Sequence, residues 1–388
     1  MVSPSKIFSP PMDCLHCGWV LHSLPDQSCT EALIWNLYRN HISSSKFFLP
    51  LLLFPLILNW RRQTRRRLWA IVKNYLQTVS VASTVNALAY YLSCILRRLN
   101  DRFVYSCIFG IPALLASQLL WLAPTRVVQF FATGVLPSAF EAVLRQLNVG
   151  LVHSRGAQTL IFMVCSLVVL RRQQIKAYSG FWFIRPAPMP ANYDKWSLGE
   201  RVKQSLLELR THLGIGLALD LINGARRKQL KKMQLKSTRF MLSCMGIYQL
   251  TQCLLANRLE SKITNLLAAF LSGGAFGLVK QTPLTYMSIG VVIASQVLWQ
   301  EFCEMDATHN GLLAILQRIP WALLFLPPSL AYLIHSMFIQ PHVLTGLAKS
   351  FLNNTADNNV QRVYALINQP TDIVMNTVQK LPIKPFLF

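Results

Sequence analysis

The amino-acid sequence predicts an all-α protein, a polytopic transmembrane helical bundle made of two repeats of about four spans each. Apolar residues make up 53% of the 388 residues and charged residues only 14%, whereas ordinary globular proteins carry roughly 25% charged residues. The apolar residues form long runs without charge, and basic residues lie in short clusters between the runs, as they do around membrane spans. We therefore expect an integral membrane protein.

The apolar runs of the first half cover residues 47–60, 74–96, 103–125, 127–144 and 156–170. A helix needs about 20 apolar residues to cross the hydrocarbon core, so the second and third runs are predicted to be full spans. The first run contains Pro50 and Pro55, which favour a re-entrant or interfacial segment. The last run is shorter and ends at Arg171 and Arg172.

The middle of the chain has a different character. Residues 185–190 read Arg-Pro-Ala-Pro-Met-Pro and cannot be helical. Residues 202–222 are amphipathic and precede a basic cluster, which predicts a linker with a helix lying on the membrane surface. The apolar runs that follow cover residues 240–257, 263–279, 281–300 and 319–348. In the last of these, two adjacent prolines are expected to kink or interrupt the span.

The two halves have the same pattern of runs and breaks, which predicts an internal duplication. An offset of 156 residues (290 − 134 = 156) aligns Gly134 with Gly290, and it also places residues 103–123 on 259–279. Such repeats are common in transporters. The predicted segments are an N-terminal cysteine-containing part, a first membrane repeat, a basic linker with an amphipathic helix, a second membrane repeat and a polar tail, at residues 1–45, 46–170, 171–238, 239–348 and 349–388.

The net charge of +23 also limits which partners the chain can have. Because the basic residues flank apolar runs and do not form a polar face, the expected partners are the bilayer and its anionic headgroups and not nucleic acid. The clearest basic group follows the first apolar run, and it fits either a targeting signal read by a peroxisomal membrane import receptor or a headgroup site. Its members are Arg61, Arg62, Arg65, Arg66 and Arg67.

Polar and small residues within the runs have two interpretations. Ser83 and Asn86 lie on a polar stripe, and Glu141 and Lys280 are ionisable groups in or beside later runs, so the four could line a polar path through the bundle. Helix packing is the more common explanation of such a stripe. Gly273 and Gly277 are four residues apart, a spacing that favours close contact between helices.

The N-terminal segment contains four residues with metal-ligand chemistry: Cys14, Cys17, His22 and Cys29. One Cys-x-x-Cys without a second matching pair is weak support for zinc. A redox pair is a further interpretation, and reduced, unpaired thiols are the commonest outcome. We therefore expect no metal and no cofactor. No nucleophile elbow, phosphate-binding loop or zinc-protease motif occurs, so no catalytic residues and no enzyme activity are predicted.

Several segments carry a resemblance to a known family. Cys14, His22 and Ser28-Cys29 are similar to the cysteine-rich start of the transmembrane protein 135 family, also called peroxisomal membrane protein 52. Residues 86–90 (Asn-Ala-Leu-Ala-Tyr) and 94–98 (Cys-Ile-Leu-Arg-Arg) resemble that family's first strong span and its basic end.

Two later segments extend the resemblance, Gln252-Cys-Leu254 and Ala269-Phe-Leu-Ser-Gly273. The second lies in a region similar to the Tim17/Tim22/Tim23 translocase group. The likeness covers residues 14 to about 310 and departs from the family in its short, acid-poor linker and its tail.

The resemblance implies a multi-pass protein of peroxisomal or mitochondrial membranes, linked to mitochondrial fission, peroxisome organisation and lipid metabolism. Our first hypothesis is therefore a non-enzymatic organelle membrane protein that moves a lipid or metabolite. The alternative is a membrane scaffold that recruits fission or organelle-organisation factors and transports nothing.

Overall fold

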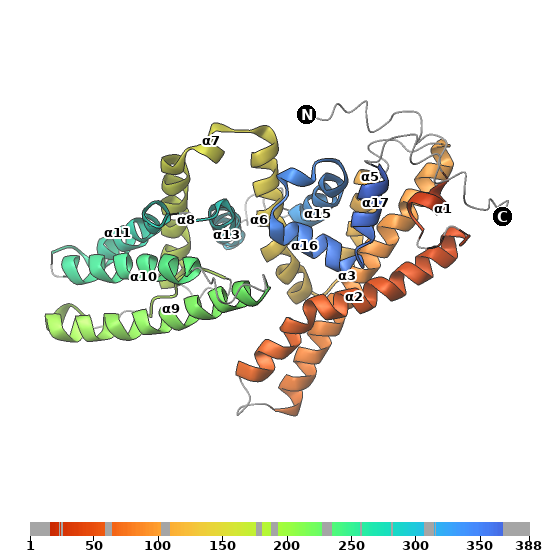
Figure 1. The fold of residues 1–388 in the computed structure, drawn as a ribbon. Helices are drawn as coiled ribbons and strands as arrows, with labels where there is room; N and C mark the ends of the chain where they lie inside the picture. Colours follow the sequence, from red (N-terminus) through yellow and green to blue (C-terminus); the bar gives the residue numbers. More distant parts are fainter. Residues whose placement is uncertain are drawn as a thin grey trace. The chain divides into compact units, whose positions relative to one another are not determined.

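The computed structural model describes residues 16–22, 24, 26–58, 64–101, 109–175, 181–187, 193–226, 235–256, 258–280, 282–305, 314 and 316–367 (Figure 1). Every regular element among these residues is a helix, and this described part of the chain contains no strand. The chain divides into two compact units, residues 1–143 together with 319–388, and residues 144–318. The predicted all-α class is confirmed.

Unit 1 is built around the long helix α3. Its elements are α1 (Cys17–Val20), α2 (Cys29–Leu58), α3 (Arg65–Asn100), α5 (Gly110–Ser117), the 3-10 helix η4 (Gln118–Leu122), most of α6 (Thr125–Leu147), α15 (Trp321–Ile339), the 3-10 helix η7 (Pro341–Val343), α16 (Gly346–Thr355) and α17 (Asn359–Ile367). Helix α2 packs along α3, α5 packs against both α3 and α15, and α16 packs on α2 (Figure 1).

Local sequence sets both ends of α3. The hydroxyl of Thr64 accepts a hydrogen bond from the Arg67 amide, and Asp101 ends the helix in the left-handed conformation with φ of 52°. Between Lys73 and Arg97 lie 23 residues (97 − 73 − 1) without charge, which extend about 35 Å at about 1.5 Å per residue. That length matches the hydrocarbon core of a bilayer.

Unit 2 is held together around α8. Its elements are the end of α6, α7 (Gly150–His153), α8 (Arg155–Ile175), the 3-10 helix η5 (Tyr193–Lys195), α9 (Leu198–Arg226), α10 (Lys236–Leu255), α11 (Ser261–Gly273), α12 (Ala275–Leu278) and α13 (Leu284–Cys303). Helix α9 packs on α10 and α10 on α11, while α8 contacts α11, α12 and α13.

Aromatic side chains fill the centre of unit 2. Phe162 of α8 is buried and its ring lies 5.4 Å from that of Phe276 and 5.6 Å from those of Trp182 and Phe240. Such rings bury large apolar areas and dominate core energetics. They join α8 to the other helices of the unit.

Three of the described helices, α3, α6 and α15, are long and apolar enough to cross a membrane. Two predicted runs are not single long helices in the part of the chain that the structure describes. Within residues 103–125, the described part holds α5 and η4, and residues 263–279 are divided at Gly274, where α11 ends. Helix α15, in contrast, continues through Pro327 and Pro328, where a kink or an interruption was predicted. The predicted amphipathic helix of residues 202–222 lies within α9.

The compact units do not follow the predicted repeat boundaries at residues 170 and 348. Helix α8, predicted in the first repeat, belongs to unit 2, and α15, predicted in the second, belongs to unit 1. The physical reason is long-range packing. Helix α8 packs against α11 and α13, and α15 buries Phe338 against Phe109 beside α5, with the two rings stacked 3.7 Å apart.

Candidate functional site

A cluster of three thiols and one imidazole lies at one end of α3 in unit 1. Its ligand-type atoms come from α1, the turn after α1, the start of α2 and the last third of α3, and all lie within 4.8 Å of one another. The residues are Cys17, His22, Cys29 and Cys94.

The elements position these groups for local reasons. Cys29 begins α2, whose first turn is fixed by a capping box: the Ser28 amide donates to the Glu31 carboxylate over 2.8 Å, and the Glu31 amide donates to the Ser28 hydroxyl over 3.2 Å. His16 caps the short helix that carries Cys17, its ring accepting from the Gly18 amide over 3.3 Å. Both cysteines are thus held at helix starts.

Two distances between ligand atoms of the cluster are close to those of a tetrahedral zinc site. With Zn–S of about 2.3 Å and Zn–N of about 2.0–2.1 Å, two sulfur ligands are about 3.8 Å apart and a sulfur–nitrogen pair about 3.6 Å apart. The Sγ atoms of Cys17 and Cys29 are 3.8 Å apart, and Sγ of Cys94 is 3.4 Å from Nε2 of His22. The described cysteines are free, not disulfide-bonded.

The other ring nitrogen of His22 is also placed for ligation. Nδ1 of His22 lies 2.9 Å from the backbone carbonyl oxygen of Gln27 and can only donate to it. In the neutral ring this hydrogen bond places the proton on Nδ1 and leaves the lone pair on Nε2, which lies 3.4 Å from Sγ of Cys94, the arrangement found in metal-bound histidines.

Burial closes the cluster to solvent. Cys17, His22 and Cys94 are 0%, 1% and 2% exposed, and Cys29 is half-buried. Burial by itself would lower the pKa of His22, but hydrogen bonds with the thiols of Cys17 and Cys29 outweigh it and raise that pKa to about 9. Hydrogen bonds with neighbouring side chains, of which the one with Cys17 has the largest effect, lower the pKa of the Cys29 thiol.

The sequence identified three of the four members and missed Cys94. Cys94 lies in an apolar run, where a thiol resembles any small hydrophobic residue, and 72 residues separate it from His22. The fourth predicted candidate, Cys14, lies outside the described residues.

A second candidate site is an open, basic hollow in unit 1 where α3 and α6 begin. Its volume is about 590 Å³, and no acidic residue is among its lining side chains. The polar and aromatic groups that line it are Arg66, Trp69, Lys73, Asn74, Gln77, Thr125 and Arg126. Of the predicted basic cluster, Arg66 alone lines the hollow. Arg65 and Arg67 are exposed beside it, and Arg61 and Arg62 lie outside the described residues.

The hollow lies where the apolar runs of α3 and α6 begin. Lys73 is the last charged residue before the run in α3, and Arg126 is the last before the run in α6. Trp69, 67% exposed, has the amphipathic ring that is enriched at membrane interfaces. In a membrane these side chains would therefore meet lipid phosphates.

Three residues of the predicted polar path, Ser83, Asn86 and Glu141, lie in unit 1, and the fourth, Lys280, lies in unit 2. Ser83 is buried and within 3.4 Å of the His41 ring, and Asn86 donates to the hydroxyl of Thr355 over 3.0 Å. Both pairs link helices of unit 1. Glu141 is buried in α6, whereas Lys280 is exposed in unit 2. Helix packing is thus the role that these contacts give to Ser83 and Asn86.

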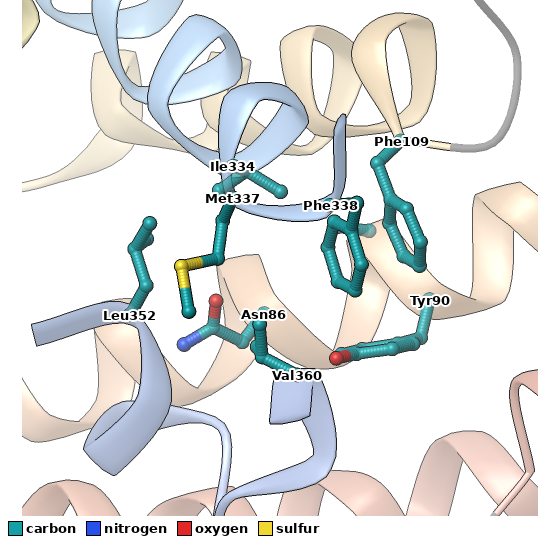
Figure 2. Close-up of a pocket in the computed structure, with 9 residues that line it drawn as sticks. Asn86, Tyr90, Phe109, Ile334, Met337, Phe338, Leu352 and Val360 are labelled. Atoms are coloured by element: carbon teal, nitrogen blue, oxygen red, sulfur yellow. The ribbon is translucent and has the colours of Figure 1, made fainter. Parts of the chain in front are cut away.

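The cavity beside Asn86 is small. It is lined by Tyr90 of α3 and by Phe109, Met337 and Phe338, and Figure 2 shows these side chains converging on it. Its volume of about 10 Å³ is no more than one water molecule needs.

The two glycines singled out by their spacing lie where α8 crosses α11 and α12. A Cβ on Gly273 would be 2.5 Å from Cα of Met163, and one on Gly277 would be 2.8 Å from the hydroxyl oxygen of Thr159. Gly273 thus allows the backbones of α11 and α8 to approach closely, and Gly277 leaves room for the Thr159 side chain.

Comparison with protein-family models, with curated proteins and with solved structures finds no match.

Proposed function

We propose that this chain is a non-enzymatic integral membrane protein that holds anionic phospholipid headgroups in the basic hollow and acts as a scaffold in peroxisomal or mitochondrial membranes. The observation that carries the proposal is the meeting of Lys73 and Arg126 at one hollow, each at the edge of an apolar run. Three cations without an acid among the lining residues favour a phosphate-bearing ligand. The organelle and the link to lipid metabolism rest on the family resemblance.

The scaffold reading is favoured over transport because polar groups in the α3 span are used for packing. Asn86 and Ser83 contact partners on other helices, and the cavity beside Asn86 fits about one water. Glu141 favours the second candidate function, movement of a lipid or metabolite, because a buried acid within a span is a functional candidate. A flux assay in liposomes with Glu141→Gln tests that candidate.

We further propose that the two halves are a duplication whose last helices pack with the opposite half. Helices α2, α3 and α5 pack in succession as α9, α10 and α11 do, and α15 contacts α5 as α8 contacts α11. Helix α9 also begins with a capping box like that of α2, formed by Ser197 and Glu200. These capping boxes are 169 residues apart (197 − 28 = 169), whereas the offset predicted from the sequence is 156 residues.

The headgroup proposal is tested by lipid binding to the purified chain in neutral detergent. Each basic residue near an anionic surface contributes about 1 kcal/mol, which is about fivefold in affinity. We expect Arg66→Gln, Lys73→Gln and Arg126→Gln combined to weaken binding of phosphatidic acid about 100-fold. Lys262→Gln, an exposed lysine of unit 2, is the matched control.

Competition and extraction complete the test. Inorganic phosphate that displaces the lipid at equal concentration would indicate a site for free phosphate, and equal binding by the triple variant would refute the proposal. Membrane residence is measured separately by extraction with alkaline carbonate, which should leave the chain in the membrane. A tagged chain imaged with peroxisomal and mitochondrial markers tests the organelle.

A further inference from the structure

We propose a structural zinc site whose four ligands are Cys17, His22, Cys29 and Cys94. It goes beyond the headgroup function, since it lies near the opposite end of α3. Residues 73 and 94 are about 32 Å apart along the helix at about 1.5 Å per residue, close to the thickness of a hydrocarbon core. The two sites would therefore be on opposite faces of the membrane.

The donor set selects the metal. Three thiolates and one imidazole form a recognised structural zinc set, and the cluster includes no carboxylate of the kind that magnesium or calcium prefers. All four tetrahedral positions are supplied by the protein, and three of the ligands are almost fully buried. A closed site of this kind has no position for a reacting water and serves structure, not catalysis.

The site also explains how the N-terminal segment is held. Helix α1 has four residues, and a helix this short is not stable by itself in water. One metal ion would join it, the following turn and the start of α2 to Cys94 on α3. Without metal, the cluster would contain an imidazole and three thiols that satisfy one another only by weak sulfur hydrogen bonds.

The decisive measurement is the metal content of the full chain. Purified in detergent with a reductant after expression in zinc-supplemented medium, the protein should contain about one zinc per chain by inductively coupled plasma mass spectrometry. Cys94→Ser and His22→Ala should lose that zinc. Cys244→Ser, which alters a buried free cysteine of unit 2, should retain it. Full zinc in Cys94→Ser, or iron or copper in place of zinc, would overturn the proposal.

A second measurement uses the unaltered chain, so it does not depend on the folding of a variant. Maleimide labelling, quantified by peptide mass spectrometry, should leave Cys17, Cys29 and Cys94 unmodified until a zinc chelator is added. Cys244 should react equally with and without the chelator. If chelation changes the labelling of none of the three cluster thiols, no metal protects them and the site does not exist. Replacement of zinc by cobalt should further give the visible bands of tetrahedral thiolate-bound Co(II).

Discussion

The guanidinium group of Arg362 on α17 donates a hydrogen bond to the backbone carbonyl oxygen of His22, which lies 340 residues earlier in the chain. The same group lies 3.5 Å from the carbonyl oxygen of Val20. Helix α17 is thus hydrogen-bonded to the turn that carries His22, the histidine of the cluster. Docking of α17 should therefore depend on this guanidinium group.

Replacing Arg362 tests this dependence. Hydrogen bonds from a charged group contribute about 1.5–3 kcal/mol, so Arg362→Gln should raise hydrogen exchange in residues 346–367 while zinc remains bound. Arg39→Gln is the control, because it removes a partly exposed ion pair with Asp357 that should contribute little. If the two variants exchange alike, Arg362 does not hold α17.

Close packing of α8 against α11 gives a second prediction. Gly273→Ala would place a methyl group 2.5 Å from a backbone atom of Met163, and overpacking of this kind costs about 1–3 kcal/mol. The midpoint of thermal unfolding in detergent should therefore fall. Gly246→Ala is the matched control in α10, because no atom lies within 4 Å of the added carbon. It should stabilise the chain slightly, by up to about 1 kcal/mol. A Gly273→Ala protein as stable as the wild type would contradict the close approach.

A buried carboxylate caps α10 from the neighbouring helix α9. Asp220 accepts from the amides of Ser237 and Thr238 over 3.0 and 2.9 Å, and from the Thr238 hydroxyl over 2.7 Å. Asp220→Ala would leave these donors unpaired, at about 1–3 kcal/mol per buried group, and should strongly lower the thermal unfolding midpoint. Glu260→Ala should change it little, because Glu260 precedes α11 without a side-chain capping bond. Similar midpoints for both variants would contradict the capping role.

Glu208 should make the stability of unit 2 depend on pH. Burial raises the pKa of this carboxyl, although hydrogen bonds from Gln204 and Gln249 oppose the shift. Because the folded state holds the proton more tightly than the unfolded state, the group's contribution to stability is complete below the ordinary glutamate pKa and is lost as pH rises through the folded value.

Replacing Glu208 by glutamine removes the loss of stability that accompanies ionisation of the buried carboxyl. Glu208→Gln should be more stable than the wild type at neutral pH, and the gap should narrow as the pH falls toward the ordinary glutamate value. In the wild type the Gln249 amide donates to a Glu208 carboxylate oxygen over 2.7 Å. In the variant it can still donate to the glutamine side-chain oxygen. Thermal unfolding midpoints measured across this pH range check the prediction, and a gap that stays constant would contradict it.

Sequence alone determined the helical, membrane-suited character of the chain, the basic flanks of its apolar runs and three of the four cluster residues. These are local properties, since hydropathy, charge and ligand type can be read from neighbouring residues. Tertiary structure alone decided that Cys94 joins the cluster, that Lys73 meets Arg126, and that α8 and α15 pack away from their own halves. Such pairings depend on which surfaces are buried together across long stretches of chain, and an apolar run has the same composition whichever helix it contacts.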